Sequence, residues 1–188
     1  NTRQRDNNLY PDFFSSNPDA LINQSEEIWI RNGVRVNPGK RHHKFLGMIF
    51  ERSLGLCLVS PSAVMIKKTL FDAVGLFDEN LPACEDYDMW LRVSCRFPVD
   101  LIKDPLIVKQ GGHADQLSRQ PSLDKYRIQS LKKLLDSDML SEEQRMAAVG
   151  MLKKKCEIYA AGCEKRGRGE EAAYYRRLSK AYWTERVE

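Results

Sequence analysis

Three acidic residues fall within one predicted helical turn, where side chains of this type can accept a proton. Glu85, Asp86 and Asp88 come first. Apolar residues then follow at helical spacing, namely Met89, Trp90, Val93 and Phe97. Because the unpaired backbone N–H groups and the dipole of a helix N-terminus favour negative charge, a carboxylate there stays ionised and can act as a general base. The same residues would equally serve as a structural acidic first turn of an amphipathic helix, and spacing alone leaves both interpretations open.

The stretches on either side of this acidic helix form an ordered set of short motifs. Upstream, an apolar segment at 62–68 ends in two lysines, and residues 71–79 read Phe-Asp-Ala-Val-Gly-Leu-Phe-Asp-Glu. Downstream, residues 105–109 begin with Pro-Leu, and residues 111–113 are Gly-Gly-His. This order resembles the acceptor-side half of family 2 glycosyltransferases of the GT-A type. In that family a strand with a basic end leads to a vG-x-FDE turn, an ED-x-D-x-W-x-R helix, and a pL strand with a His beyond it.

The resemblance covers about residues 20–120 and implies an α/β fold. It predicts a partial GT-A glycosyltransferase fold, with a mixed sheet and flanking helices, followed by an α-helical C-terminal region. The chain would divide into an irregular lead-in (1–19), the acceptor-side half (20–121) and a helical extension (122–188). The implied enzyme is an inverting glycosyltransferase that moves a sugar from a nucleotide-sugar donor to a hydroxyl acceptor, for example in polysaccharide biosynthesis. The alternative is a non-catalytic interaction module built on a degenerate glycosyltransferase scaffold.

Within the acidic helix, the resemblance assigns catalysis to Asp86 and Glu85. Asp86 would take the proton from the acceptor hydroxyl as its oxygen attacks the anomeric carbon. Glu85 would orient the acceptor or a loop. Arg92 lies nearly two turns after Asp86 and would bind the donor diphosphate, although an ion pair with Asp78 or Glu79 explains it equally well.

Stabilising a diphosphate leaving group usually takes a divalent cation, and the resemblance places a ligand for it at His113. The cofactor would be Mg²⁺ or Mn²⁺ in the full-length enzyme. The N-terminal side has no convincing D-x-D motif, because the Asp-Tyr-Asp of residues 86–88 occupies the position of the base. Ser118 and Arg119 would contact the diphosphate as a hydroxyl donor and a cation. A surface position is the alternative interpretation of His113.

A GT-A enzyme also needs a nucleotide-binding half, a region of about 100 residues by the usual size of a domain. That half should precede residue 1, and the chain starts abruptly without a Met, so we expect a fragment of a longer enzyme. We therefore expect residues 1–188 alone neither to bind a nucleotide sugar well nor to transfer sugar.

Local patterns predict the elements of the first half of the chain. Residues 20–35 read as a β-hairpin around Asn32-Gly33, a strong two-residue turn signal. A basic loop at 40–44 follows, for which a phosphate-facing position is a minority interpretation. Residues 45–54 then read as an apolar helix.

The second half of the chain reads mainly as helix. Residues 68–74 predict a short helix that Gly75 ends, and residues 100–110 predict two strands around Asp104-Pro105. Three helical segments follow from residue 124 to the C-terminus. The second begins at residues 141–144, Ser-Glu-Glu-Gln, which have the form of a capping box.

Length and composition set outer limits on the protein. The chain has 188 residues, 42% hydrophobic and 30% charged, which suits one domain of ordinary size with a buried core. No apolar run approaches the roughly 18 residues of a membrane span, and the polar N-terminus does not read as a signal peptide. The five cysteines are scattered, with no C-x-x-C pair, which favours reduced thiols. We therefore expect a cytoplasmic location.

The net charge of +4 is concentrated at the C-terminal end. Residues 122–188 carry 15 Lys and Arg against 11 Asp and Glu, whereas the charges of residues 1–121 balance. A solvated helical surface explains this excess, and a weak attraction to an anionic membrane face is the alternative. Nucleic-acid binding is not expected, because the excess is small and the basic segments have few interleaved aromatic residues.

Overall fold

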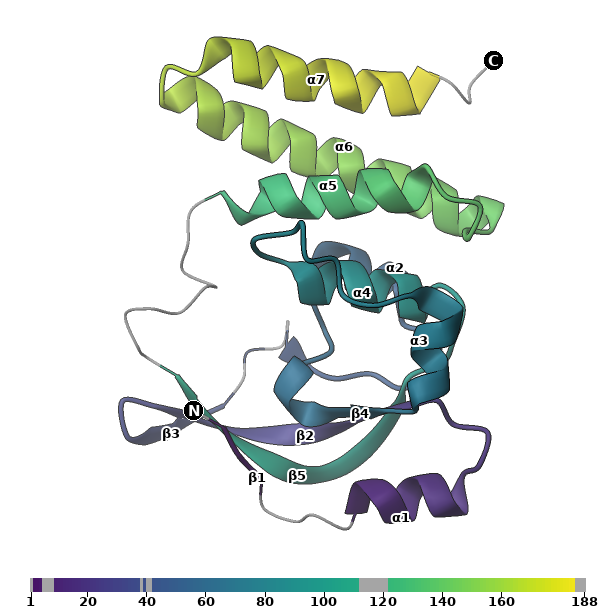
Figure 1. Cartoon of the computed structure of the whole chain (residues 1–188). Coiled ribbons are helices and arrows are strands. Elements are labelled where there is room, and N and C mark those ends of the chain that lie inside the picture. Colours follow the sequence, from purple (N-terminus) through teal and green to yellow (C-terminus); the bar gives the residue numbers. More distant parts are fainter. Residues whose placement is uncertain (1, 5–8, 38, 40–41, 112–121, 185–188) are drawn as a thin grey trace.

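A computed structural model of the chain describes residues 2–4, 9–37, 39, 42–111 and 122–184. It has an α/β fold, with one mixed sheet, helices on both faces of the sheet and three helices at the C-terminal end (Figure 1). The strands are β1 (Thr2–Gln4), β2 (Ile22–Arg31), β3 (Val34–Val36), β4 (Val64–Ile66) and β5 (Asp100–Gly111). Their order is β1-β5-β2-β3, and β4 also pairs with β2.

The long strands β2 and β5 form the centre of the sheet and run parallel. The other pairs, β1 with β5, β2 with β3 and β2 with β4, are antiparallel. The expected two strands around Asp104-Pro105 are in fact one strand. The register between β2 and β5 shifts on both sides of Glu26, which pairs with Pro105, so the extra residues are absorbed as an irregularity of a continuous strand.

The predicted hairpin is confirmed. Strands β2 and β3 pair antiparallel, with Arg31 opposite Val34. The turn between them consists of Asn32 (φ 50°) and Gly33 (φ 79°). Two successive positive φ values characterise the two-residue turn whose twist matches that of the strands, which is why Asn-Gly predicts it so well.

Helices cover the sheet on both faces (Figure 1). Helix α1 (Leu9–Ser16) lies on one face. The other face carries α2 (Phe50–Gly55), the 3₁₀ turn η2 (Pro61–Ala63), α3 (Lys68–Val74) and α4 (Glu85–Ser94). Beyond α2 and α4 lie α5 (Leu123–Leu135), α6 (Glu142–Lys165) and α7 (Gly169–Thr184). None of the helices in the described residues is long and apolar enough to cross a membrane.

Two local expectations need correction. The lead-in at 1–19, expected to be irregular, contains β1 and α1. Helix α1 is held by tertiary contacts, because its buried Tyr10 hydroxyl donates a hydrogen bond to Ser25 Oγ of β2 (2.7 Å). The expected helix at 45–54 begins only at Phe50, since Gly47 has a positive φ (89°) and exchanges backbone hydrogen bonds with Val99 (2.8 and 2.9 Å).

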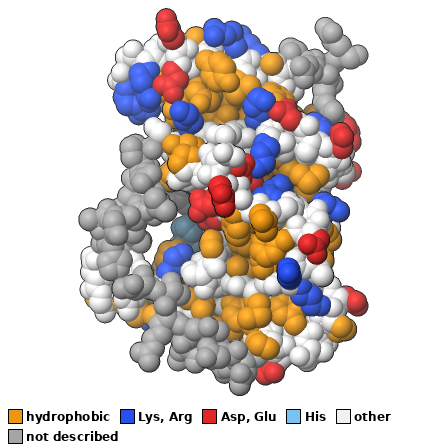
Figure 2. All heavy atoms as spheres, in the orientation of Figure 1, with side chains coloured by type: hydrophobic (Ala, Val, Ile, Leu, Met, Phe, Trp, Pro, Cys, Tyr) orange, Lys and Arg blue, Asp and Glu red, His pale blue; other side chains and the backbone are white. Residues whose placement is uncertain are grey.

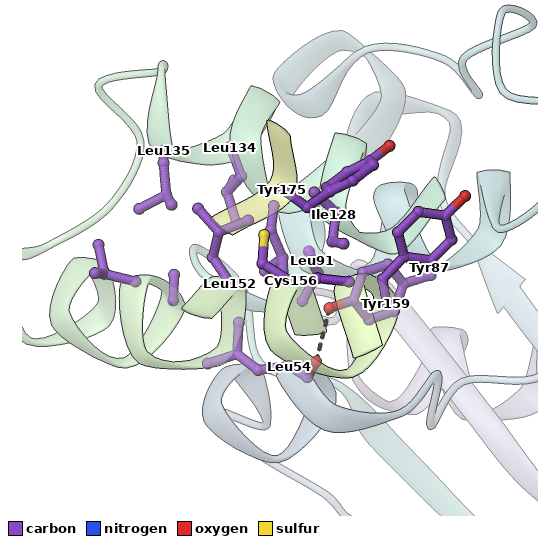
Figure 3. Packing of buried hydrophobic residues seen from close by; sticks show 14 of the residues in the cluster. Leu54, Tyr87, Leu91, Ile128, Leu134, Leu135, Leu152, Cys156, Tyr159 and Tyr175 are labelled. Carbon is purple, nitrogen blue, oxygen red and sulfur yellow. Dashed lines mark hydrogen bonds between the residues drawn. The ribbon is translucent and has the colours of Figure 1, made fainter. Parts of the chain in front are cut away.

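The apolar interior has two large parts on the face of the sheet that carries α2, α3 and α4. One lies between the sheet and helices α3 and α4, and includes Ile22, Leu70, Met89, Trp90 and Val93. The other lies between α2, α4 and the three C-terminal helices (Figure 3). In this second part, the hydroxyl of Tyr87 on α4 donates to the carbonyl of Leu54 on α2 (2.7 Å). Tyr87 therefore links the two helices directly behind the acidic first turn of α4.

Helix ends follow their sequence signals. Helix α3 ends at Val74, and Gly75 after it is the expected C-cap. Gly75 has a positive φ (79°), and its N–H donates a hydrogen bond to the carbonyl of Phe71 (2.8 Å). Helix α6 begins with the predicted capping box, in which Ser141 Oγ accepts from the N–H of Gln144 (3.2 Å) and Gln144 Oε1 accepts from the N–H of Ser141 (3.0 Å).

Candidate functional site

The first turn of α4 positions the two carboxylates that the sequence singles out. The helix starts at Glu85, because Cys84 before it adopts a left-handed conformation (φ 64°) that does not continue a helix. Helical bonding begins where the N–H of Asp88 donates to the carbonyl of Cys84 (3.1 Å). Asp86 Oδ1 accepts a hydrogen bond from the N–H of Tyr87 (2.7 Å), so the carboxylate satisfies one of the open donors of this turn.

The other oxygen of Asp86 has a neutral partner. Cys57 Sγ lies within hydrogen-bond distance of two acceptors, Asp86 Oδ2 (3.4 Å) and the carbonyl oxygen of Val59 (3.3 Å), and can donate its one hydrogen to either. Burial and the nearby Asp86 charge raise the pKa of Cys57 well above its ordinary value, so the thiol keeps the hydrogen that it donates. The ion pairs found among the described residues all involve other carboxylates. No described cation therefore neutralises Asp86.

A cavity of about 440 Å³ lies next to Asp86. One wall is formed by β2, β3 and β5 of the sheet, a second by residues 56–61, and a third by the first turn of α4 with the start of α5. In Figure 2 the surface is hollowed between the sheet and the helices, with acidic and basic side chains near the rim. The volume is that of a site for a small molecule. The charged side chains that line it are Glu27, Arg31, Lys44, Glu85, Asp86, Lys109 and Arg127.

The sheet wall carries alternating charged and aromatic side chains. Glu27, Trp29 and Arg31 lie on one face of β2, because successive side chains of a strand point to opposite faces. The register places Lys109 of β5 beside Trp29, and Lys109 Nζ lies 5.3 Å from the centre of the Trp29 ring. Lys109 Nζ also donates a hydrogen bond to Ser60 Oγ over 3.4 Å.

Behind these residues lies a buried ion pair. Lys44 Nζ is 3.7 Å from Glu27 Oε2, and both side chains are 4% exposed. Glu27 Oε2 also accepts a hydrogen bond from Trp29 Nε1 (3.2 Å). Lys44 Nζ and Glu27 Oε1 have no hydrogen-bond partner in the part of the chain that the structure describes. Burial lowers the pKa of Lys44, the charge of Glu27 opposes that shift, and Lys109 adds to it.

The C-terminal helices support the third wall. Arg127 of α5 pairs with Asp124 one turn earlier (3.2 Å). Lys155 of α6 is bonded to Asp124 (3.4 Å) and to the carbonyl of Gly55 (3.3 Å), and burial lowers its pKa. These contacts attach α5 and α6 to the end of α2. Helix α5 therefore keeps Arg127 at the cavity.

Of the residues expected at the site, the structure brings Glu85 and Asp86 to the cavity and does not bring Arg92 there. The Arg92 side chain is buried and forms an ion pair with Asp88 (2.9 Å). It also donates hydrogen bonds to the carbonyls of Val74 and Leu76. These contacts use the guanidinium to join α3 to α4, so the expectation that Arg92 binds the donor diphosphate is wrong.

The alternative partner expected for Arg92 also differs in the structure. Asp78 pairs with Lys133 of α5 (2.7 Å), and Lys133 reaches Asp88 as well (3.0 Å). Asp88 is buried between the two cations. This network ties the loop before α4 to the C-terminal helices and lies away from the cavity-lining residues.

His113, Ser118 and Arg119 lie in the segment 112–121, outside the described residues. Within the described ranges, no group of three His, Cys, Asp or Glu side chains could hold a metal ion. The described side chains therefore offer no ligand set for the expected Mg²⁺ or Mn²⁺.

Sequence reasoning did not assign a role to Glu27, Trp29 or Lys109, and it considered Lys44 only as part of the basic loop 40–44, with a phosphate-facing position as a minority interpretation. A signal existed in the alternation of Glu27, Trp29 and Arg31, which predicts that all three share a face of a strand. Nothing local indicates that β5 pairs parallel with β2, so the contribution of Lys109 could not be predicted. The same holds for Lys44, whose partner is 17 positions away in the sequence.

The chain matches no protein-family model, and its sequence has no significant match among curated proteins.

Proposed function

We propose that this chain forms the acceptor side of an inverting glycosyltransferase, in which Asp86 removes the proton from an acceptor hydroxyl. One observation carries the proposal: Asp86 lines a cavity of small-molecule size while no described cation pairs with it. A carboxylate in that position has unused acceptor capacity facing the cavity. This arrangement suits a general base, which must lie within hydrogen-bond reach of the proton it takes.

In the proposed step, the hydroxyl proton moves to an Oδ atom of Asp86 while the acceptor oxygen forms a bond to the anomeric carbon of the donor sugar. The bond from that carbon to the diphosphate breaks on the opposite face, and the diphosphate leaves with the electron pair. The configuration at the anomeric carbon is therefore inverted. Glu85, on the same helical turn and the same cavity, would orient the acceptor.

The remaining parts of the proposal rest on the family resemblance alone. A nucleotide-binding half would hold the donor, and Ser118 and Arg119 would contact its diphosphate. A divalent cation, with His113 as a ligand, would neutralise the leaving diphosphate.

The test is an assay of nucleotide release by the natural protein that carries this chain, with a panel of nucleotide sugars and hydroxyl acceptors. The proposal predicts release that depends on the acceptor, and a product with inverted anomeric configuration. Retention of configuration would overturn the inverting mechanism. Absence of release with every pair would favour the alternative, a non-catalytic module. Transfer by residues 1–188 alone would contradict the assignment of donor binding to a separate half.

A further inference from the structure

The charges of the cavity are distributed unevenly between its walls. Glu85 and Asp86 lie on the α4 wall together with Arg127, which pairs with Asp124 (3.2 Å), and Asp86 Oδ2 lies 3.4 Å from Cys57 Sγ. On the sheet wall, the charges of Glu27 and Glu26 raise the pKa of Lys44, and the charge of Lys109 lowers it. A molecule in the cavity therefore meets two carboxylates and the paired Arg127 on one side. On the other side it meets Glu27 with the cations Arg31, Lys44 and Lys109.

The sheet wall has more positive than negative charge at its surface. Glu27 is the carboxylate that lines this wall, and it pairs with the buried Lys44 behind it (3.7 Å). Lys44 thus neutralises Glu27, which leaves the charge of Lys109 uncompensated. Among the described residues, Lys109 forms no ion pair, and its one hydrogen bond goes to Ser60 Oγ. An ammonium group has three donors, and the described residues accept a hydrogen bond from one of them.

The buried pair has unmet polar groups of its own. Both side chains are more than nine-tenths buried. Lys44 Nζ and Glu27 Oε1 nevertheless have no hydrogen-bond partner among the described residues. Burying charged groups without full hydrogen bonding is costly. An anion bound to Lys109 would lower that cost, because it offsets the repulsion between the ammonium groups of Lys109 and Lys44.

We propose that the sheet wall binds an oxyanion, a carboxylate or a phosphate, on the acceptor sugar, with Lys109 as the contacting residue and Lys44 as its electrostatic support. That this ligand is the sugar acceptor rests on the proposed function. Arg127 on the α4 wall is already paired with Asp124, and Glu85 and Asp86 repel an anionic group, so this group is favoured at Lys109 and a hydroxyl of the same sugar is directed toward Asp86. Specificity for an acidic sugar then follows from the positions of the charged residues in the cavity.

The test is direct binding to the purified 188-residue chain, measured by calorimetry at low salt. The probes are methyl glucuronide, methyl galacturonide and glucose 6-phosphate, each compared with its uncharged parent sugar. We expect at least one anionic probe to bind about tenfold more tightly than its parent. Carboxylate and phosphate sources are distinguished by which probe shows the preference. Equal binding, or no binding, of all three pairs would overturn the inference.

Variants then locate the site. Lys109→Met should remove the preference for the anionic probe, and Lys109→Arg should retain it. Lys154→Met, at an exposed position on α6, is the matched control and should change nothing. An unchanged preference in Lys109→Met would contradict the proposed contact. Uridine diphosphate is a competing ligand: if Lys109→Met weakens its binding but not that of the acidic sugars, the site belongs to the donor and the inference fails.

Failure of this inference and failure of the proposed function are separable, because binding is measured without transfer. An anion preference that depends on Lys109, together with undiminished transfer in Asp86→Asn, would leave the binding site standing and remove the proposed base. Loss of transfer in Asp86→Asn without any anion preference would do the reverse.

Discussion

Cys57 Sγ lies 3.4 Å from Asp86 Oδ2 and can donate its hydrogen to that carboxylate or to the carbonyl of Val59 (3.3 Å). The contact joins the segment 56–61 to the first turn of α4, two parts of the chain that form different walls of the cavity. The backbone N–H of Tyr87 holds the other oxygen. The carboxylate therefore has a defined orientation, and no cation among the described residues forms an ion pair with it.

Removing the thiol should loosen that orientation. We expect Cys57→Ala to lower kcat/KM for sugar transfer about fivefold, the equivalent of one neutral hydrogen bond of about 1 kcal/mol. Cys57→Ser keeps a donor and should stay near the parent value. The measurement is steady-state transfer by the natural protein. If Cys57→Ala is as active as the parent, or if Cys57→Ser loses as much as Cys57→Ala, the thiol does not position Asp86.

Arg92 should matter for stability. Arg92→Met leaves Asp88 buried beside Lys133 with one cation fewer and leaves the carbonyls of Val74 and Leu76 without their donor. We expect a loss of about 3 kcal/mol or more in the free energy of unfolding, measured in urea. Adding Asp88→Asn should recover part of it. An unchanged stability in Arg92→Met would show that these contacts contribute little and would reopen a role for Arg92 in ligand binding.

The features that the sequence predicts well are local ones. The turn at Asn32-Gly33, the C-cap at Gly75 and the capping box at residues 141–144 each depend on a few adjacent residues, and each is present. The α/β class with a mixed sheet and C-terminal helices is also as expected. The acidic first turn of α4 was found because helical spacing and N-terminal charge are both local signals.

The features that the sequence missed depend on pairing between distant segments. Strand β1 has a polar sequence, and it is a strand because its backbone pairs with that of β5. Helix α1 depends on the contact of Tyr10 with Ser25. The burial of Arg92 follows from how α3 packs on α4, which spacing along one helix does not reveal. In the same way, Lys109 joins the cavity only through the parallel register of β5 with β2.

The capping box of α6 has a tertiary role that a simple cap lacks. Ser141→Ala should cost about 1 kcal/mol, because it removes the acceptor for the N–H of Gln144. Gln144→Ala should cost more, since the Gln144 side chain also donates to the carbonyl of Cys95 at the end of α4 (2.9 Å). Urea denaturation of both variants checks the order. Equal losses would mean that the contact with Cys95 adds nothing.

Stability should fall at alkaline pH. Burial raises the pKa of Cys156 to about 12 and that of Cys95 to about 11, from an ordinary value of 9.0. The unfolded chain therefore loses these protons first, so the stabilisation is complete below about pH 9 and is lost as the pH rises toward the folded-state values.

Circular dichroism with a reductant present should accordingly show a lower Tm at pH 10.5 than at pH 8. Cys156→Ala should lower the Tm at both pH values and reduce the difference between them. A Tm that is constant or rises over this range would show that the buried thiols do not control stability at high pH.

The central claim is that the Asp86 carboxylate takes the acceptor proton, and the most direct measurement is kcat for sugar transfer by Asp86→Asn in the natural protein. We predict a loss of about a thousandfold, within the range of a general base, with thermal unfolding unchanged. Asp72→Asn, at an exposed position on α3, is the matched control and should keep full activity. Transfer by a folded Asp86→Asn variant at the rate of the parent would contradict the account.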